Sequence, residues 1–413
     1  MTTIVQKFGG TSVADAAKIK RAAQRVKQAK DEGHGVITVV SAMGKSTDSL
    51  VDLAFQMSEE PDKREMDMLM STGEQVTISL MVMALKELGI EAVSLTGWQA
   101  GIRTEPVHQN ARITDIETSN IERYLDEGKV VIVAGFQGMT EEGEITTLGR
   151  GGSDTTAVAL ASALQAENCT IFTDVAGVFT SDPRVVNKAR QLKSVSYDEM
   201  LELANLGAGV LHPRAVEFAK NYAIPLIVRS SMEEQEGTVV EEEASMEQNL
   251  IVRGLAFESG VTKVTVEGMQ NEVNTLTNLF STLAQSGINV DIIIQQLTED
   301  DRVNVSFSIH TQALRETLNV LENNKNKLNY TKVRHLDQLA KVSIVGSGMV
   351  SNPGVAADMF QVLSEQEVRV QMVSTSEIKV SVVVEEEKMT NAVEALHTFF
   401  ELDEKVEVQA NMA

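Results

Sequence analysis

The second half of the chain contains an internal duplication, and this feature restricts its possible folds more than any other. Residues 263–268 (KVTVEG) align with residues 341–346 (KVSIVG) at a shift of 78 residues. Each copy has the pattern strand, loop, helix, strand, strand, helix, which is typical of a ferredoxin-like βαββαβ module. Further matching segments are 288–292 with 368–372 and 303–309 with 378–384. We therefore expect two such modules, over residues 246–335 and 336–413.

The first half has a different pattern, in which short β-rich runs alternate with longer helical stretches. The predicted strands include residues 36–40, 91–95, 130–134 and 170–173, and the predicted helices include residues 14–30, 73–88 and 155–166. Such alternation is typical of βαβ units around a largely parallel sheet. We expect one α/β domain over residues 1–245.

Between the two halves the composition changes. Residues 233–247 (EEQEGTVVEEEASME) contain seven glutamates and few large apolar residues, as expected of a solvated connector. An acidic loop within a single domain would have the same composition. Because the pattern of elements changes beyond this segment, we place the domain boundary there.

The excess of acidic residues argues against some classes of partner. The chain of 413 residues has 59 Asp and Glu against 36 Lys and Arg, and a formal charge of −23 repels nucleic acid and anionic lipid surfaces. No secretion signal is visible, and no apolar run approaches the roughly 20 residues of a spanning helix. The single cysteine, Cys169, cannot form an intrachain disulfide. We expect a cytoplasmic protein with neither a nucleic-acid nor a membrane partner.

Two glycine clusters each lead from a predicted strand into a predicted helix. In the first, residues 4–12 (IVQKFGGTS), Lys7 ends the strand and Gly9 and Gly10 form the turn. Glycines let backbone N–H groups approach an anion, the helix N-terminus adds partial positive charge, and Lys7 adds a full charge. The segment is not a Walker A loop, because its lysine precedes the glycines. It fits a phosphate-binding loop, although a glycine pair also fits an ordinary tight turn.

The second cluster is residues 148–156 (LGRGGSDTT), where Ser153 or Asp154 is suited to cap the following helix. Capping does not explain Arg150 in so flexible a loop. A guanidinium there could hold a carboxylate through two parallel hydrogen bonds. The segment therefore predicts a carboxylate-binding site.

These clusters, together with further motifs in the same order, resemble those of the aspartokinases, the aspartate-phosphorylating branch of the amino acid kinase superfamily. The motifs are KFGGTSV (7–13), SAMG (41–44), GEQ (73–75), GRGGSDTTA (149–157), TD (173–174), FTSDPR (179–184) and GAGVLHP (207–213). The duplicated modules resemble ACT domains, so the resemblance covers nearly the whole chain. It implies an α/β amino acid kinase domain with a mainly parallel sheet between helices, followed by two ferredoxin-like ACT modules, in a monofunctional enzyme.

The resemblance implies transfer of the γ-phosphoryl group of ATP, with Mg²⁺, to the β-carboxylate of L-aspartate. A carboxylate is already ionised at neutral pH, so this nucleophile needs no general base. By motif, Lys7 would neutralise charge on the phosphoryl group, and Asp154 would organise Lys7 or the magnesium shell. The implied aspartate-binding residues are Thr47, Glu74, Arg150 and Ser153. The implied nucleotide-binding residues are Lys7, Phe8, Gly9, Gly10, Ser12, Ser41, Gly44, Thr173, Asp174, Phe179, Thr180, Ser181, Asp182, Pro183 and Arg184.

The resemblance also implies feedback inhibition by an end-product amino acid, lysine with or without threonine, at interfaces between ACT modules. The implied effector residues are Asn271, Asn274, Asn289, Val290, Asp291, Gln295, Ser374, Thr375 and Glu377. We expect either a homo-oligomer or a heterotetramer whose regulatory subunit begins near Met246. One position departs from the family pattern: Gly209 stands before VLHP where many relatives have lysine, so no nucleotide-binding lysine is assigned there.

Two other functions remain as alternatives. Residues 341–349 (KVSIVGSGM) resemble the start of a dinucleotide fingerprint, but Ser351 occupies the third glycine position and the other copy lacks the motif. This feature would suit a nicotinamide-dependent dehydrogenase. The duplicated modules alone would suit a non-catalytic amino acid sensor, although Lys7 and Arg150 argue against it.

Overall fold

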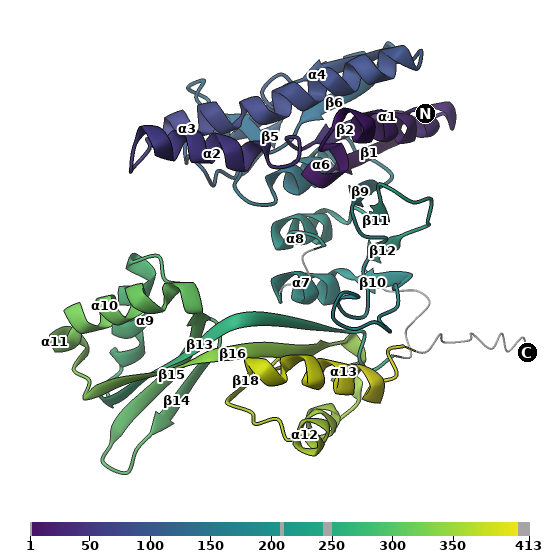
Figure 1. Ribbon diagram of the computed structural model, residues 1–413. Helices are drawn as coiled ribbons and strands as arrows, with labels where there is room; N and C mark the ends of the chain where they lie inside the picture. Colours follow the sequence, from purple (N-terminus) through teal and green to yellow (C-terminus); the bar gives the residue numbers. More distant parts are fainter. Residues whose placement is uncertain (1, 207–209, 243–249, 404–413) are drawn as a thin grey trace, which may run out of the picture. The chain divides into compact units, whose positions relative to one another are not determined.

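The computed structural model describes residues 2–206, 210–242 and 250–403 (Figure 1). The chain forms two compact units. The N-terminal unit comprises Met1–Phe179, Gln191–Asn205 and Gly209–Gln248, and the C-terminal unit comprises Thr180–Arg190, Leu206–Ala208 and Asn249–Ala413.

The N-terminal unit is built on an eight-stranded sheet in which all neighbours are parallel except β11 and β12. Its central strands are continuous apolar runs buried on both faces, as parallel sheets between helices require. In spatial order the strands are β10 (Ser194–Ser196), β12 (Thr238–Glu241), β11 (Leu226–Ser230), β9 (Cys169–Thr173), β1 (Thr3–Phe8), β2 (Gly35–Val40), β6 (Val130–Ala134) and β3 (Ala92–Leu95).

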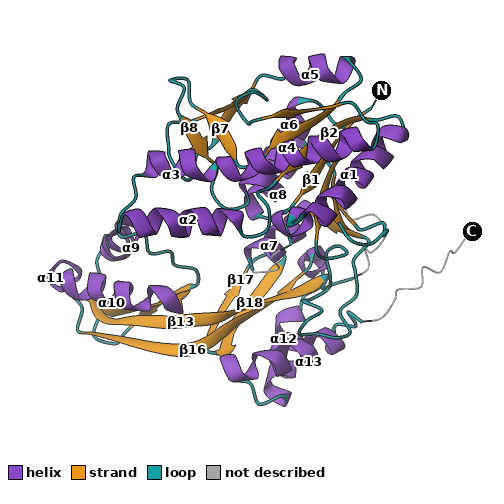
Figure 2. Cartoon of the chain, turned by 45° about the horizontal axis from the view of Figure 1, so that its top comes forward, coloured by secondary structure: helices purple, strands orange, loops and turns teal. Residues whose placement is uncertain are grey.

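Helices cover both faces of this sheet. On one face α1 (Ala16–Asp31) and α4 (Thr72–Glu87) lie side by side (Figure 2), and they share a core with Ile4 and Phe8 of β1. Because side chains alternate along a strand, Val5 and Lys7 point to the opposite face, where α6 (Gly152–Ala163) contacts β1. Lys7 therefore points to the face of the sheet that α6 covers. The remaining helices are α2 (Ser46–Met57), α3 (Lys63–Met70), α5 (Ser119–Asp126), α7 (Tyr197–Asn205), α8 (Pro213–Tyr222) and the short η1 (Gly10–Val13).

A small four-stranded sheet, which the sequence did not predict, accompanies the main one. Its order is β5 (Ile113–Ile116), β4 (Ile102–Thr104), β7 (Gln137–Met139) and β8 (Ile145–Thr147). The strands are three or four residues long, too short for a clear alternation in the sequence. Strand β8 leads directly into the second glycine cluster.

One stretch differs from the expectation that no apolar run could span a membrane. Lys63–Glu87, which spans α3 and α4, is 25 residues long and contains an 18-residue window with a mean hydropathy of 1.3, enough by length and composition alone. In the fold, however, Ile78, Met81 and Leu85 of α4 are buried in the core shared with α1. We interpret the stretch as a helix pair of the fold, in which Ile78, Met81 and Leu85 serve packing while Val76 and Met83 are exposed.

The acidic segment 233–247 is only partly a connector. Thr238 and Val240 are fully buried in β12, which pairs with β10 and β11. The expectation of a solvated connector is therefore wrong over Thr238–Glu241, where β-branched residues alternate inward as in any half-buried strand. Residues 243–249, including Met246 and the expected domain boundary, lie outside the described residues, as does Gly209.

The C-terminal unit contains one six-stranded antiparallel sheet. Helices α9 (Thr275–Gln285), α10 (Leu314–Asn323) and α11 (Lys325–Leu328) lie at one end of it, and α12 (Val355–Glu365) and α13 (Met389–Phe399) lie at the other (Figure 1). In spatial order the strands are β14 (Ile293–Leu297), β15 (Arg302–His310), β13 (Gly254–Gln270), β16 (Lys332–Val345), β18 (Lys379–Glu385) and β17 (Met372–Thr375). Short 3₁₀ turns are η2 (Thr311–Ala313), η3 (Ser347–Ser351) and η4 (Glu386–Lys388).

Strand β13 links the two copies of the repeat. Its second half, from Val261, pairs with β15 and belongs to the core of the first copy. Its first half, residues 254–258, pairs with residues 341–345 of the second copy, and the register shifts between the two halves. The second module thus takes a strand from ahead of the first module. The linear boundary between residues 335 and 336 stays a prediction.

A short segment between β9 and β10 also belongs to the C-terminal unit. Within Thr180–Arg190, the carbonyl of Thr180 accepts a hydrogen bond from the N–H of Leu255 at 2.7 Å. Val186 of this segment is 3% exposed and packs in the core beneath α12 and α13. Part of the second module's core therefore comes from Val186, which precedes Leu255 of the same core by 69 residues in the sequence.

Candidate active site

A pocket of about 990 Å³ in the N-terminal unit brings together many of the predicted site residues. It lies where the loops after the parallel strands β1 and β2, and the loop after β8 of the small sheet, meet the starts of α2, α4 and α6. Nine predicted residues line it: Lys7, Gly10, Ser41, Gly44, Thr47, Glu74, Arg150, Ser153 and Asp154.

Lys7 and Asp154 form an ion pair in this pocket. The distance between Lys7 Nζ and Asp154 Oδ1 is 2.5 Å, and the two side chains are 10% and 14% exposed. The N-cap of α6 is Gly151, so Asp154 lies inside the first turn and the expectation that it or Ser153 would cap the helix is wrong. Gly151 takes the cap position because its left-handed backbone turns the chain into the helix. The pair therefore places one cation and one anion side by side at the pocket wall.

The first glycine loop is closely packed against the loop after β2. A Cβ on Gly10 would lie 3.0 Å from the carbonyl oxygen of Ala42 and 3.2 Å from that of Gly44. The N–H of Gly9 donates to Phe172 O at 3.3 Å, and the hydroxyl of Ser12 contacts the same carbonyl at 3.5 Å. Of this loop, Lys7 and Gly10 line the pocket, whereas Phe8, Gly9 and Ser12 are not among its lining residues.

The second glycine loop needs glycine for its backbone conformation. Gly149 and Gly151 have φ values of 76° and 67°, in the left-handed region. A Cβ on Gly151 would also lie 2.1 Å from the ring of His212, which is the N-cap of α8. Burial lowers the pKa of His212, which favours the neutral form of the ring that packs against the loop.

Glu74 is buried at the base of the pocket. Its Oε1 accepts a hydrogen bond from the N–H of Ala42 at 3.1 Å, and its Oε2 has no hydrogen-bond partner among the described residues. Burial raises the pKa of Glu74 to about 8, and hydrogen bonding to the backbone of Glu74 itself and of Ala42 opposes this only partly. A buried carboxyl oxygen without a partner suits a cationic ligand group that would restore its charge.

The predicted nucleotide residues are divided between the two units. Thr173 ends β9, and its hydroxyl donates to Asp174 at 3.2 Å. Phe179 lies in the N-terminal unit, whereas Thr180–Arg190 belongs to the C-terminal unit. The hydroxyl of Thr180 is buried against His397 Nε2 at 2.9 Å. Asp182 and Arg184 form an ion pair with each other at 2.7 Å. None of these residues is among those that line the pocket, and their nucleotide role stays a prediction.

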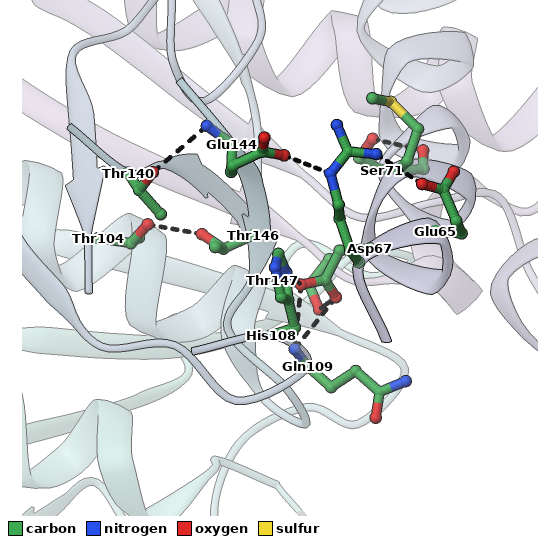
Figure 3. Close-up of polar contacts among 12 residues, drawn as sticks. Glu65, Asp67, Ser71, Thr104, His108, Gln109, Thr140, Glu144, Thr146 and Thr147 are labelled. Carbon is green, nitrogen blue, oxygen red and sulfur yellow. Dashed lines mark hydrogen bonds and ion pairs between the residues drawn. The ribbon is translucent and has the colours of Figure 1, made fainter. Parts of the chain in front are cut away.

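The sequence missed a polar network beside the pocket, shown in Figure 3. Asp67 in α3 is fully buried and accepts hydrogen bonds from Thr147 and from the backbone of Gln109, and it contacts His108. Gln109 also lines the pocket, as does Phe136. An aspartate within a methionine-rich helical stretch belongs to no motif. Only its charge in an otherwise apolar run could have drawn attention to it.

The predicted effector residues lie in the C-terminal unit, in or near its exposed edge strands. Gln295 is in β14, and Ser374 and Thr375 are in β17; these two strands form the edges of the sheet. Asp291 makes an ion pair with Lys341 at 2.5 Å. Asn271 donates to Asp301 at 2.7 Å, and Asn274 is the N-cap of α9. Asn289, Val290 and Glu377 flank these strands, and the effector role of the whole set stays a prediction.

The dinucleotide-like motif has a packing role. A Cβ on Gly346 would lie 2.3 Å from the carbonyl oxygen of Ile251, and one on Gly348 would lie 2.7 Å from Leu250 O. The motif follows a strand of an antiparallel sheet and leads into the 3₁₀ turn η3, whereas dinucleotide-binding loops lead from a parallel strand into a helix. Close backbone packing explains these glycines without a cofactor.

Comparisons with known proteins agree with the fold and the motifs. The Amino acid kinase family matches residues 2–230, and the ACT domain family matches residues 342–400. An aspartokinase of Bacillus sp. (strain MGA3) is 67% identical over 402 residues, which cover 97% of this chain and 98% of the relative. The chain belongs to the aspartokinases.

Solved structures of the family align over most of the chain. E. coli aspartokinase III in complex with aspartate and ADP (R-state) has a TM-score of 0.80 at 27% identity and covers 96% of this chain and 99% of its own. The same enzyme in complex with lysine and aspartate (T-state) has a TM-score of 0.77, with the same identity and coverage. The resemblance and the fold class expected from the sequence are confirmed, and the chain is an ATP-dependent phosphotransferase of this family.

Proposed function

We propose that this chain transfers the γ-phosphoryl group of ATP to the β-carboxylate of L-aspartate, giving 4-phospho-L-aspartate. The observation that carries the proposal is the pocket that holds the Lys7–Asp154 pair together with Arg150 and Glu74. One wall supplies a cation for a phosphoryl group. The others supply the two opposite charges that a free α-amino acid requires.

Charge neutralisation is the main task of this site. The nucleophile and the phosphoryl group are both anionic, and an ionised carboxylate needs no base. Lys7 would neutralise charge on the transferring group, and the ion pair with Asp154 would hold its ammonium in place. Glycine at position 10 lets the first glycine loop pack against the loop after β2, because a Cβ there would lie 3.0 Å from Ala42 O.

Aspartate would be held by its α-carboxylate and α-ammonium. Arg150 is exposed at the pocket and can grip a carboxylate through two hydrogen bonds, and Glu74 offers an unpartnered oxygen to the ammonium. Thr47 near the start of α2 and Ser153 near the start of α6 line the same pocket and would orient the substrate.

Mg²⁺ would come with the nucleotide. Among the described residues, no group of three or more His, Cys, Asp or Glu could hold a metal ion. Magnesium commonly keeps several waters and uses substrate phosphates as ligands, so the site does not need a protein cage. The metal would neutralise phosphate charge. The nucleotide residues from Thr173 to Arg184 remain part of the proposal, and the cytoplasm is the compartment that we propose for the reaction.

Feedback inhibition by lysine, with or without threonine, is part of the proposal. Lysine is bound in the T-state structure of the E. coli relative. The edge strands β14 and β17 carry Gln295, Ser374 and Thr375 and present unpaired backbone groups, so paired modules of an oligomer would cover them. We expect Thr375→Ile to relieve inhibition without loss of kcat. Undiminished inhibition of this variant would exclude β17 from the effector site.

A hydroxamate assay of the purified chain tests the reaction. ATP and Mg²⁺ with L-aspartate should give an acyl phosphate that hydroxylamine traps, whereas D-aspartate and L-asparagine should not. Lysine, threonine and diaminopimelate are then titrated singly and in pairs. Effector binding without any acyl phosphate would favour the non-catalytic sensor instead.

A further inference from the structure

Asp67 makes an unusual set of contacts for a side chain in a helix beside the pocket. It is 0% exposed, and it contacts Thr147, His108 and the backbone of Gln109. Its Oδ1 accepts from Thr147 Oγ1 at 2.6 Å, and its Oδ2 lies 2.8 Å from His108 Nδ1. The N–H of Gln109 points at both oxygens, at 3.1 and 3.0 Å. A buried carboxylate is costly unless it is fully hydrogen-bonded, so these contacts are coupled to one another.

The groups that Asp67 holds belong to two adjacent segments. Thr147 is the last residue of β8, two residues before Gly149. Gln109 has a φ of 68°, a left-handed conformation that is uncommon for a residue with a side chain. Its carbonyl oxygen would lie 3.0 Å from a Cβ on Gly149, so the two segments are in close contact. Asp67 thus fixes the entry to the loop that carries Arg150 (Figure 3).

The same two segments are held from another direction by Arg214 of α8. Its guanidinium donates to Leu148 O at 2.7 Å, to Asn110 Oδ1 at 3.2 Å and to Ala111 O at 3.2 Å. The start of the Arg150 loop therefore rests on a buried carboxylate and on a guanidinium. Arg150 itself is exposed and owes its position to the backbone that carries it.

We propose that Asp67 is a positioning residue for aspartate binding: it orders Gln109 and the end of β8, and through them the loop that presents Arg150. The inference rests on the proposed role of Arg150. Because Arg150 would grip the α-carboxylate equally before and during phosphoryl transfer, loosening the loop raises the KM for aspartate and leaves kcat unchanged.

Two adjacent threonines of β8 provide a matched test. Thr147→Val removes the hydrogen bond to Asp67, and Thr146→Val removes one to Thr104 at 2.5 Å; both residues are fully buried. Thr147→Val should raise the KM for aspartate about tenfold, with kcat and the KM for ATP changed less than about twofold. Thr146→Val should lower the melting temperature similarly and leave all three constants unchanged. Equal KM values in the two variants would overturn the inference.

Asp67→Asn extends the test, because the amide keeps the shape and changes one acceptor into a donor. It should raise the KM for aspartate more than Thr147→Val does. If Asp67→Asn does not fold, the threonine pair still decides. Arg150→Lys in parallel separates the two proposals: a raised aspartate KM there with an unchanged one in Thr147→Val rejects only the role of Asp67. An unchanged aspartate KM in Arg150→Lys rejects the assignment of Arg150 and the inference with it.

Discussion

Gly10 and Gly151 line the same pocket, but the fold requires glycine at the two positions for different reasons. Gly10 has a backbone conformation that residues with a side chain also adopt. It must be glycine because a Cβ there would lie against the carbonyl groups of Ala42 and Gly44. Gly151 adopts a left-handed conformation and in addition abuts the ring of His212. The side that we propose for the phosphoryl group thus depends on close packing between the first glycine loop and the loop after β2. The side that we propose for aspartate depends on a left-handed loop conformation that glycine can adopt.

From this comparison we predict that loss of a charge on the phosphoryl side lowers kcat. Lys7→Ala should lower kcat by about a hundredfold or more, since it removes the cation aimed at the phosphoryl group. The circular dichroism spectrum should stay native, because Lys7 makes an ion pair at the pocket wall and is not part of a core cluster. A variant with more than about a tenth of the normal kcat would mean that Lys7 does not neutralise the transition state.

On the aspartate side, we expect a change in the backbone conformation of the glycine loop to lower the stability of the fold. Gly151→Ala should destabilise the fold in urea by more than the roughly 1–2 kcal/mol of left-handed strain, because His212 must also move. Gly143→Ala is the control, since Gly143 has a φ of 88° with nothing near its Cβ position. If both variants lose equal stability, the contact with His212 has no energetic role.

We expect a smaller effect from a variant that keeps the fold and changes only the hydrogen bonds between Arg150 and the substrate carboxylate. Arg150→Lys keeps the charge but loses the planar two-point contact, so the KM for aspartate should rise about tenfold while the KM for ATP stays the same. Initial rates over a grid of both substrates measure this. The opposite outcome, weaker ATP binding alone, would assign Arg150 to the phosphoryl side.

The smallest effect concerns protons. With a pKa of about 8, Glu74 is mostly protonated at neutral pH in the empty site, and an ammonium ligand favours its ionised form. Aspartate binding should then release a proton, and the KM for aspartate should fall as the pH rises toward about 8. Glu74→Gln should bind aspartate more weakly and lose this slope. A wild-type KM that does not change with pH would show that Glu74 is ionised before aspartate binds.

The sequence predicted the parts of the site that depend on local chemistry. Lys7 lies at the carboxyl end of a parallel strand, where ligand sites form, and Arg150 and Asp154 lie in and just after a glycine-rich loop. The pairing of Lys7 with Asp154 and the buried state of Glu74 needed the tertiary fold, because burial is set by distant segments. Asp67 could not be found, since its partners lie about 40 and 80 positions away.

The C-terminal half shows the same limit at the level of domains. The repeat predicted two ferredoxin-like units, and the strands and helices of both copies are present. The pattern could not show that residues 254–258 pair with the second copy, because hydrogen bonding between strands leaves no mark in the order of elements. Nor could it show that Val186 is part of that core.

The place of Thr180–Arg190 has a practical meaning for recombination among relatives. A chimera joined near residue 245 would combine the regulatory half of one aspartokinase with residues 180–190 of another. Val186 would then pack against foreign partners in place of Val252 and Leu255. A regulatory polypeptide that began at Met246 would lack this segment, so its core would lack the Val186 side chain. A chimera that takes this whole core from one parent must therefore transfer two separate stretches of coding sequence.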